Sequence, residues 1–244
     1  MQVSIQALAQ KLISWIGDTV ASAGGKGVVL GMSGGIDSSV AAALCKRAFP
    51  DATLGVIMPC HSMDIDREHA ELVATKFNIP VKIVALDEVF DALIKALPAE
   101  GYDMTTRKLA ENNIKPRLRM VTLYYWANRL NYLVAGSSNR SELSVGYFTK
   151  HGDGGSDLIP LGNLTKRQVR ELAEHLDIPR EIIDKPPSAG LWDGQTDEAE
   201  LGLTYEELDR YLVTGKAEPK IKEKIDFKMS QSTHKRCLPP VPPM

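Results

Sequence analysis

Residues 31–39 read GMSGGIDSS and stand between two apolar segments of different character. The segment before them, GVVL at residues 27–30, predicts a strand, and VAAAL at residues 40–44 predicts a helix. Adjacent glycines let a backbone approach a ligand closely, while serine hydroxyls and the first amides of a helix supply hydrogen-bond donors. A strand, a tight loop and a helix in this order therefore predict a nest for an anion, above all a phosphate.

The loop differs from the common phosphate-binding loops, because it carries Asp37 where they carry a lysine or a third glycine. A carboxylate repels phosphates unless a divalent cation bridges the two, so Asp37 implies magnesium. The alternative is a glycine-rich turn whose aspartate caps the helix. The pattern SGGxDS[ST] resembles the pyrophosphate-binding loop of ATP pyrophosphatases, which adenylate a substrate and release pyrophosphate.

Composition favours one globular catalytic domain over residues 1–244. Charged residues make up 25% of the chain and the net charge is −2, so no overall basic field recruits nucleic acid or an anionic membrane. The widely spaced Cys45, Cys60 and Cys237 form no CxxC pair, which argues against a zinc site or a disulfide framework. With neither a membrane-length apolar run nor a signal peptide in the sequence, we expect a soluble, cytoplasmic protein.

The remaining apolar patterns predict alternating strands and helices. Helices are expected at residues 4–20 and 64–77, and strands at residues 53–58, 81–84 and 132–136. Strands separated by helices imply right-handed crossovers, so the expected fold is α/β, a doubly wound open parallel β-sheet with helices on both faces. Ligands bind such sheets at the carboxyl ends of the strands, where residues 31–39 lie.

Capping residues predict where several later helices begin. A helical region at residues 103–131 should break near Asn112 and restart with Pro116 in its first turn, where proline is tolerated. Thr165 is a good helix cap, which puts Lys166 at a helix N-terminus. A cation there opposes the helix dipole, and its position is easier to understand if it faces a phosphate. Two short helices are expected at residues 205–212 and 219–228.

Three polar segments have both a structural and a functional interpretation. Residues 58–61 follow a strand and could line an adenine pocket, although a single histidine such as His61 is more often an ordinary loop residue. Residues 148–157 form either a flexible surface turn or a loop that closes over substrate. Residues 230–244 form a proline-rich tail, which we expect to be mobile.

Six further motifs together resemble the NAD synthetase family. They occur in that family's order and spacing within residues 27–236: KPRLRM at 115–120, Gly136-Ser137 followed by Glu142, residues 148–157, LTKRQ at 164–168, KPPSA at 185–189 and DEAELG at 197–202. The resemblance implies an adenine nucleotide alpha hydrolase-like fold. It also implies conversion of deamido-NAD to NAD with ATP, magnesium and ammonia.

The resemblance assigns roles to individual positions. The ATP-binding positions would be Gly31, Met32, Ser33, Gly34, Gly35, Ile36, Asp37, Ser38, Ser137, Lys166 and Ser188. The positions contacting deamido-NAD would be Arg117, Lys150, Asp157, His234 and Lys235. Asp37 and Glu142 would hold magnesium, and Asp37, Lys166 and Ser188 would act in catalysis.

The chain departs from the family pattern at four positions. Ile36 stands where glutamine is common, and serine replaces threonine at positions 137 and 188, which keeps the hydroxyl. Pro116 replaces a small helical residue and leaves open whether Arg117 or Arg119 contacts substrate.

The implied reaction needs no nucleophilic side chain. The nicotinate carboxylate attacks the α-phosphorus of ATP, and magnesium, Lys166 and the loop amides meet the charge that develops. One alternative is a different pyrophosphatase-loop enzyme that modifies tRNA or activates another carboxylate, which would favour cysteine pairs and a basic surface. The other is a regulatory nucleotide-binding subunit, which would have little use for two carboxylates and three lysines at one ligand.

Four further expectations follow. An amphipathic first helix and the aromatic-rich residues 123–126 predict a homodimer. Residues 152–156 and the tail around His234 should become ordered only with ligand. Free ammonia rather than glutamine should be the direct nitrogen donor. Asp37 and Glu142 should bind the same magnesium ion, since each follows a parallel strand; the alternative is a surface ion pair of Glu142 with Arg140 or a lysine.

Overall fold

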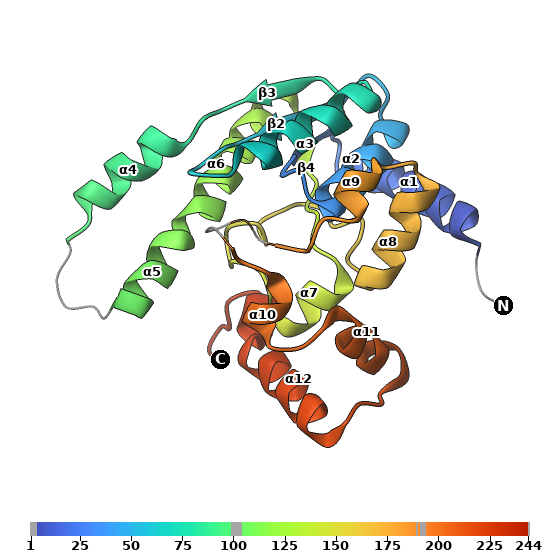
Figure 1. Ribbon diagram of the computed structural model, residues 1–244. Coiled ribbons are helices and arrows are strands. Elements are labelled where there is room, and N and C mark those ends of the chain that lie inside the picture. The colour runs from blue at the N-terminus through green and yellow to red at the C-terminus, as the bar shows by residue number, and fades with distance from the viewer. Residues whose placement is uncertain (1–3, 99–103, 189, 191–193, 244) are drawn as a thin grey trace.

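A four-stranded parallel sheet lies at the centre of the chain (Figure 1). The computed structural model describes residues 4–98, 104–188, 190 and 194–243. The strands are β1 (Val28–Gly31), β2 (Thr53–Ile57), β3 (Val81–Ile83) and β4 (Leu133–Val134), and their spatial order is β3-β2-β1-β4. Every pairing is parallel, which confirms the predicted open parallel sheet.

Helices cover both faces of this sheet. Successive side chains of a strand point to opposite faces, so Val28 and Leu30 enter one core while Val29 enters another. The first core is closed by α1 (Ile5–Ser22), α2 (Ile36–Ala48), α3 (Asp64–Lys76), α8 (Lys166–His175) and α9 (Arg180–Ile183). The second core packs against α6 (Ile114–Leu130), which completes the predicted doubly wound arrangement.

The other helices lie away from the sheet. In Figure 1, α4 (Asp87–Ala96) and α5 (Met104–Asn112) extend to one side. A second group lies below the sheet and consists of α7 (Arg140–Val145), α10 (Asp197–Leu201), α11 (Tyr205–Thr214), α12 (Pro219–Gln231) and a 3-10 turn at Thr233–Lys235. This group has its own small apolar core, which includes Leu208 and Ile225.

Several predicted helix boundaries are confirmed. The break in the region 103–131 falls at Asn113, between α5 and α6, and Pro116 lies in the first turn of α6. Thr165 caps α8, since its side chain accepts a hydrogen bond from the Gln168 backbone N–H. Lys166 is therefore the first residue of that helix, as expected.

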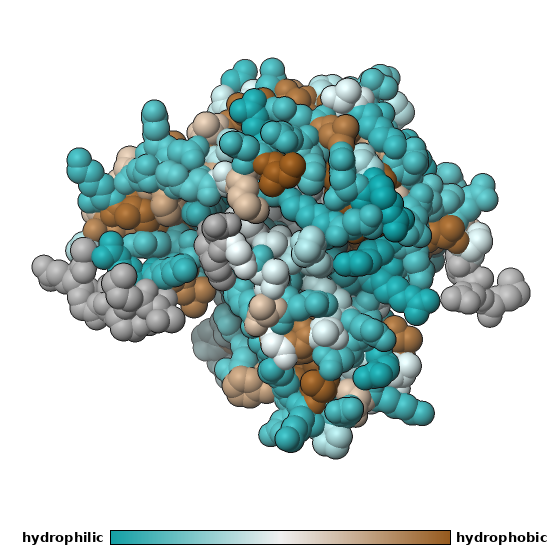
Figure 2. Space-filling model, viewed as in Figure 1, coloured by the Kyte–Doolittle hydropathy of each residue, from teal (hydrophilic) through white to brown (hydrophobic). Residues whose placement is uncertain are grey.

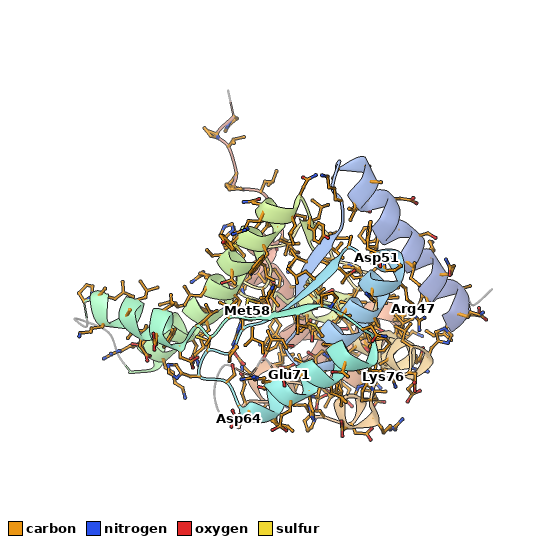
Figure 3. The ribbon with its side chains drawn as sticks, turned by 90° about the horizontal axis from the view of Figure 1, so that it is seen from above. Arg47, Asp51, Met58, Asp64, Glu71 and Lys76 are labelled. Carbon is orange, nitrogen blue, oxygen red and sulfur yellow. The ribbon has the colours of Figure 1, made fainter. Side chains whose placement is uncertain are left out.

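The topology brings the carboxyl ends of three strands to one edge. β1 lies between β2 and β4, so the segments that follow these strands are neighbours. Figure 3 shows the two ends of β2, with Asp51 before the strand and Met58 after it, on the side of α6. Polar side chains dominate the face in Figure 2, with apolar ones in small separate groups. No described helix is long and apolar enough to cross a bilayer.

Candidate active site

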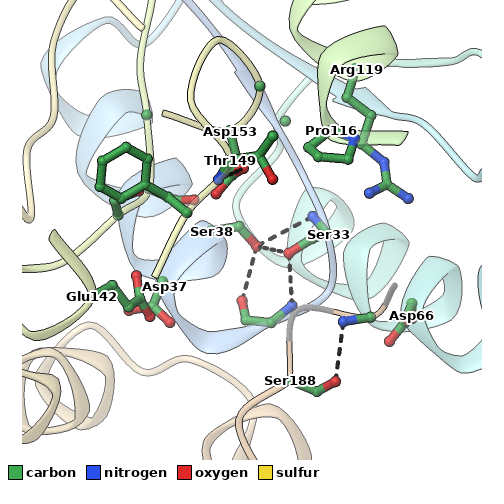
Figure 4. A pocket seen from close by; sticks show the side chains of 18 of the residues that line it. Ser33, Asp37, Ser38, Asp66, Pro116, Arg119, Glu142, Thr149, Asp153 and Ser188 are labelled. Atoms are coloured by element: carbon green, nitrogen blue, oxygen red, sulfur yellow. Dashed lines mark hydrogen bonds between the residues drawn. The ribbon is translucent and has the colours of Figure 1, made fainter. Parts of the chain in front are cut away.

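A cavity of about 480 Å³ opens at the carboxyl edge of the sheet (Figure 4). It is bounded by the loop after β1, the start of α6, the loop at residues 148–155 and the segment at residues 185–190. The sequence-predicted residues that line it are Gly31, Met32, Ser33, Gly35, Ile36, Asp37, Ser38, Ser137, Glu142, Lys166, Ser188 and Lys235. Predicted residues outside its lining are Gly34, Arg117, Lys150, Asp157 and His234. Of the expected adenine-pocket segment, Met58 and Pro59 line the cavity and His61 does not.

The serine-rich loop is held in shape by its own hydrogen bonds. Ser33 Oγ accepts from the Gly35 backbone N–H at 3.3 Å, and Ser38 Oγ donates to Gly35 O at 3.0 Å (Figure 4). Gly34 has a φ of +75°, and a Cβ there would lie 2.2 Å from the carbonyl oxygen of Asp66. Gly34 is therefore needed for the backbone path of the loop, although its own atoms do not line the cavity.

An ammonium group lies between the two carboxylates predicted to hold metal. Lys166 Nζ is 2.5 Å from Asp37 Oδ2 and 3.1 Å from Glu142 Oε1. The side chain of Lys166 is 3% exposed, so Glu142 does pair with a lysine, but in a buried cluster with Asp37 and not in the surface ion pair considered as the alternative. Since both carboxylates contact the same nitrogen, both are within reach of one small cation.

This donor set fits magnesium. Magnesium is usually held by one or two carboxylates, with phosphate oxygens and water completing an octahedral shell. Asp37 and Glu142 supply two carboxylates beside the serine-rich loop. The described part of the chain contains no cluster of three or more His, Cys, Asp or Glu side chains placed to hold a metal.

Asn139 connects the two carboxylates. Its side-chain amide donates to Asp37 Oδ1 at 2.8 Å, and its backbone N–H donates to Glu142 Oε2 at 3.2 Å. Its side-chain oxygen in turn accepts from the Glu142 backbone N–H at 3.0 Å, which forms a capping box at the start of α7. Asn139 is fully buried, so it fixes the relative orientation of both acids.

Tyr205 of α11 also contacts the cluster. Its hydroxyl donates to Asp197 Oδ2 at 2.9 Å and lies 3.3 Å from Glu142 Oε1. Its ring centroid lies 4.9 Å from Lys166 Nζ, a cation-π contact. Tyr147 donates to the other oxygen of Asp197 at 3.0 Å.

Burial and neighbouring charges shift the pKa values of the groups in this cluster. Burial raises the pKa of Glu142 to about 7, a shift that Lys166 opposes and Asp37 reinforces. For Lys166 burial acts to lower the pKa, but the two carboxylates outweigh it, and the net pKa is raised. Burial also raises the pKa of Tyr147 and of Tyr205, so both hydroxyls stay protonated as donors.

Three of the residues expected to contact deamido-NAD are linked by hydrogen bonds outside the cavity lining, while a fourth, Lys235, lies in the lining itself. Arg117 is exposed and its guanidinium lies 3.4 Å from Lys150 O. Lys150 Nζ donates to His234 O at 2.7 Å, and Lys235 Nζ donates to Gly146 O at 2.8 Å.

Asp157 and the chain end have other partners. Asp157 accepts from Tyr124 Oη and the Val134 N–H. Arg236 donates to Leu143 O and Ser144 O at the end of α7. Mobility of the tail without ligand remains a prediction, and these hydrogen bonds of Arg236 hold the tail to α7 in this structure.

Sequence reasoning missed Asn139, Tyr147 and Tyr205, and it noted Asp197 only as part of a motif. Asn139 had a signal, because an Asn three residues before a Glu is a capping-box pattern. Tyr205 had none, since its contacts depend on how α11 packs against α7 and α8.

The loop rich in serine and glycine lies between a strand and a helix, at the carboxyl edge of a parallel sheet. This arrangement defines an α/β nucleotide-binding protein of the PP-loop class. The family model for NAD synthase matches residues 8–239. The chain therefore belongs to the NAD synthase family.

Similar proteins span the full length of the chain. The NH(3)-dependent NAD(+) synthetase of Carboxydothermus hydrogenoformans is 49% identical over 99% of both chains, and that of Syntrophomonas wolfei is 50% identical over 97% of this chain and 95% of its own. Among solved structures, NMN synthetase from Francisella tularensis is 38% identical, with a TM-score of 0.94 over 100% of both chains. NH3-dependent NAD synthetase from Campylobacter jejuni is 30% identical, with a TM-score of 0.81 over 99% of this chain and 100% of that one.

Proposed function

We propose that this protein is a ligase that amidates deamido-NAD with ammonia, using ATP and magnesium, to give NAD, AMP and pyrophosphate. This is the last step of NAD biosynthesis. The observation that carries the proposal is the convergence of Asp37, Glu142 and Lys166 beside the serine-rich loop in one cavity. The relatives named as NAD synthetases cover nearly the whole chain and support it.

The reaction divides into two transfers. An oxygen of the nicotinate carboxylate attacks the α-phosphorus of ATP, the bond to the bridging oxygen breaks, and pyrophosphate leaves. Ammonia then attacks the acyl carbon of the adenylate and loses a proton, and AMP leaves. Lys166 and the amides of the loop offset negative charge on the phosphate oxygens, and magnesium held by Asp37 and Glu142 would add charge there. Ser33, Ser38 and Ser188 act as donors that position phosphates, so catalysis rests on placement and electrostatics.

Direct use of ammonia is supported by the state of two cysteines. Cys45 is fully buried, which raises the pKa of its thiol to about 12, and burial also raises the pKa of Cys60. Neither thiol is activated as the nucleophile that a glutaminase reaction needs. Product formation with glutamine alone, in ammonia-free buffer and without a partner protein, would contradict this part of the proposal.

The test combines protein, ATP, magnesium, deamido-NAD and ammonium, with NAD and AMP as the products measured. Asp37→Asn and Glu142→Gln should each lower adenylation by more than about a hundredfold and leave the fold intact. Normal turnover of Glu142→Gln at limiting magnesium would exclude a shared ion.

Amidation of nicotinate mononucleotide is the second candidate. The NMN synthetase structure from Francisella tularensis matches this fold with a TM-score of 0.94, against 0.81 for the Campylobacter jejuni NAD synthetase. Sequence identity favours the dinucleotide, since relatives named as NAD synthetases reach 49–51%, against 38% for the NMN synthetase. The ratio of kcat/KM for deamido-NAD to that for nicotinate mononucleotide decides between the two.

We also propose a cytoplasmic homodimer. Arg117 and Lys150 are expected to contact deamido-NAD but lie outside the lining of this chain's cavity, which favours a substrate site completed by a second copy. Val121 and Tyr125 of α6 and Trp15 of α1 expose apolar surface that a partner could cover. Full activity from a species with the mass of one chain in light scattering would contradict the dimer.

A further inference from the structure

The guanidinium of Arg119 lies at the cavity wall with neutral partners only. Its Nε donates to Met58 O at 3.1 Å, and its Nη2 donates to Ser62 Oγ at 3.1 Å. Figure 4 shows the side chain reaching from α6 into the pocket beside Pro116. None of the ion pairs found within 4.0 Å among the described residues includes Arg119.

A half-buried guanidinium of this kind usually has an anion bound to it. Burial is the main cause that lowers the pKa of Arg119, and Cys60, Asp153, Asp66 and Asp87, none of which forms an ion pair with it, oppose the shift only in part. Buried charges in proteins are normally paired, because an unpaired one loses its hydration without compensation. A guanidinium has five N–H donors, and the two hydrogen bonds above use two of them.

Arg119 also faces a different part of the cavity from Lys166. In Figure 4, Asp37 and Glu142, which flank Lys166, lie across the pocket from Arg119, and the serine-rich loop lies between them. The serine-rich loop and Lys166 can serve one group of phosphates. Arg119 is therefore placed to bind a second anionic group.

We propose that Arg119 binds an anionic oxygen, of a phosphate or a carboxylate, on a nucleotide in this cavity. The planar fork of the guanidinium suits two oxygens of such a group. The nucleotide that supplies this oxygen is either ATP or the nicotinate nucleotide. Only the choice between these two nucleotides rests on the proposed function.

The test measures the two affinities separately by calorimetry, ATP with magnesium in one arm and deamido-NAD or nicotinate mononucleotide in the other. Arg119→Gln should weaken binding of one ligand by at least about tenfold, the effect of losing a hydrogen bond to a charged group, and Arg119→Lys should restore part of it. The affected arm identifies the source. Arg47→Gln is the control, because Arg47 is an exposed arginine in the last turn of α2 and does not line the cavity, and both affinities should stay unchanged.

If Arg119→Gln binds both ligands with affinities within about twofold of wild type, the proposal is overturned. Arg119 would then only hold α6 against the segment after β2. If Arg119→Gln does not fold, the wild-type protein provides the test. Phenylglyoxal should modify Arg119 less when one nucleotide is bound, while modification of Arg47 is unaffected, and lack of protection by every nucleotide refutes the proposal. Loss of ATP binding in the variant together with no amidation of any nicotinate nucleotide by the wild type would leave this inference standing and reject the proposed function.

Discussion

Replacing Lys166 with methionine should destabilise the protein and make its stability depend on magnesium. The substitution keeps most of the buried volume but leaves Asp37 and Glu142 without their shared cation. Removing one partner of a buried ion pair costs about 3–5 kcal/mol, which for a chain of this length lowers Tm by about 6–20 °C. Asp37 keeps a donor from Asn139 and Glu142 keeps donors from Asn139 and Tyr205, so we expect the lower half of that range.

Magnesium should recover part of the loss. In the wild type a metal ion must displace the ammonium of Lys166, whereas in Lys166→Met the two carboxylates are free to bind it. A ligand that binds only the folded state stabilises it in proportion to the logarithm of its concentration over its Kd. Thermal unfolding followed by circular dichroism, with and without millimolar magnesium, should therefore show a larger rise in Tm for the variant than for the wild type.

Two controls separate this effect from general ones. Lys11→Met removes an exposed lysine of α1 and should change neither Tm nor its response to magnesium. Adding Glu142→Gln to Lys166→Met replaces one charged carboxylate ligand with a neutral amide and should cancel most of the magnesium effect. An unchanged Tm for Lys166→Met, or equal magnesium responses in variant and wild type, would refute the assignment of these carboxylates to a shared cation site.

Three other outcomes are expected. Tyr205→Phe keeps the ring beside Lys166 but removes a donor to Asp197, and should lower stability by about 1–3 kcal/mol in urea unfolding; a smaller change would show that the hydroxyl is dispensable. Burial raises the pKa of the Asp153 carboxyl above its usual value of 3.8. The stability that this carboxyl contributes is therefore fully present below pH 3.8 and is lost as the pH rises through its pKa in the folded protein. The Tm of Asp153→Asn minus that of wild type should therefore grow from pH 4 upward. In the native protein one thiol, that of exposed Cys237, should react rapidly with Ellman's reagent, and three in the unfolded protein.

The start of the sheet could be predicted because the sequence patterns that specify it are local. A β-branched run, two glycines and an alanine-rich segment at residues 27–44 specify strand, loop and helix without reference to the rest of the chain. The meeting of Asp37 and Glu142 could be predicted as well, since β1 and β4 are parallel neighbours and each acid follows one of them. The helix at Asp87–Ala96 was missed, although Val89, Phe90, Leu93 and Ile94 recur at helical spacing and Phe90 packs against the second core.

Which of Arg117 and Arg119 faces the cavity could not be predicted from sequence. Positions two apart on a helix differ by about 200° in direction, so at most one of the two side chains faces the cavity. The rotation of α6 is set by packing of residues such as Ala127 against the sheet, which involves strands far away in the sequence. Arg119 lines the cavity and Arg117 lies outside it, exposed, which is a consequence of tertiary structure alone.

The ammonium of Lys166 also explains how two buried carboxylates can be preorganised without a metal. Asp37 and Glu142 would repel each other if left alone, and burial would favour protonation, as the raised pKa of Glu142 indicates. Lys166 neutralises the pair, while Asn139 fixes the orientation of both acids. Metal binding is then an exchange, in which the displaced ammonium needs a new anionic partner. Phosphate oxygens on the serine-rich loop are the nearest candidates, so magnesium should bind this site far more tightly with ATP than without it.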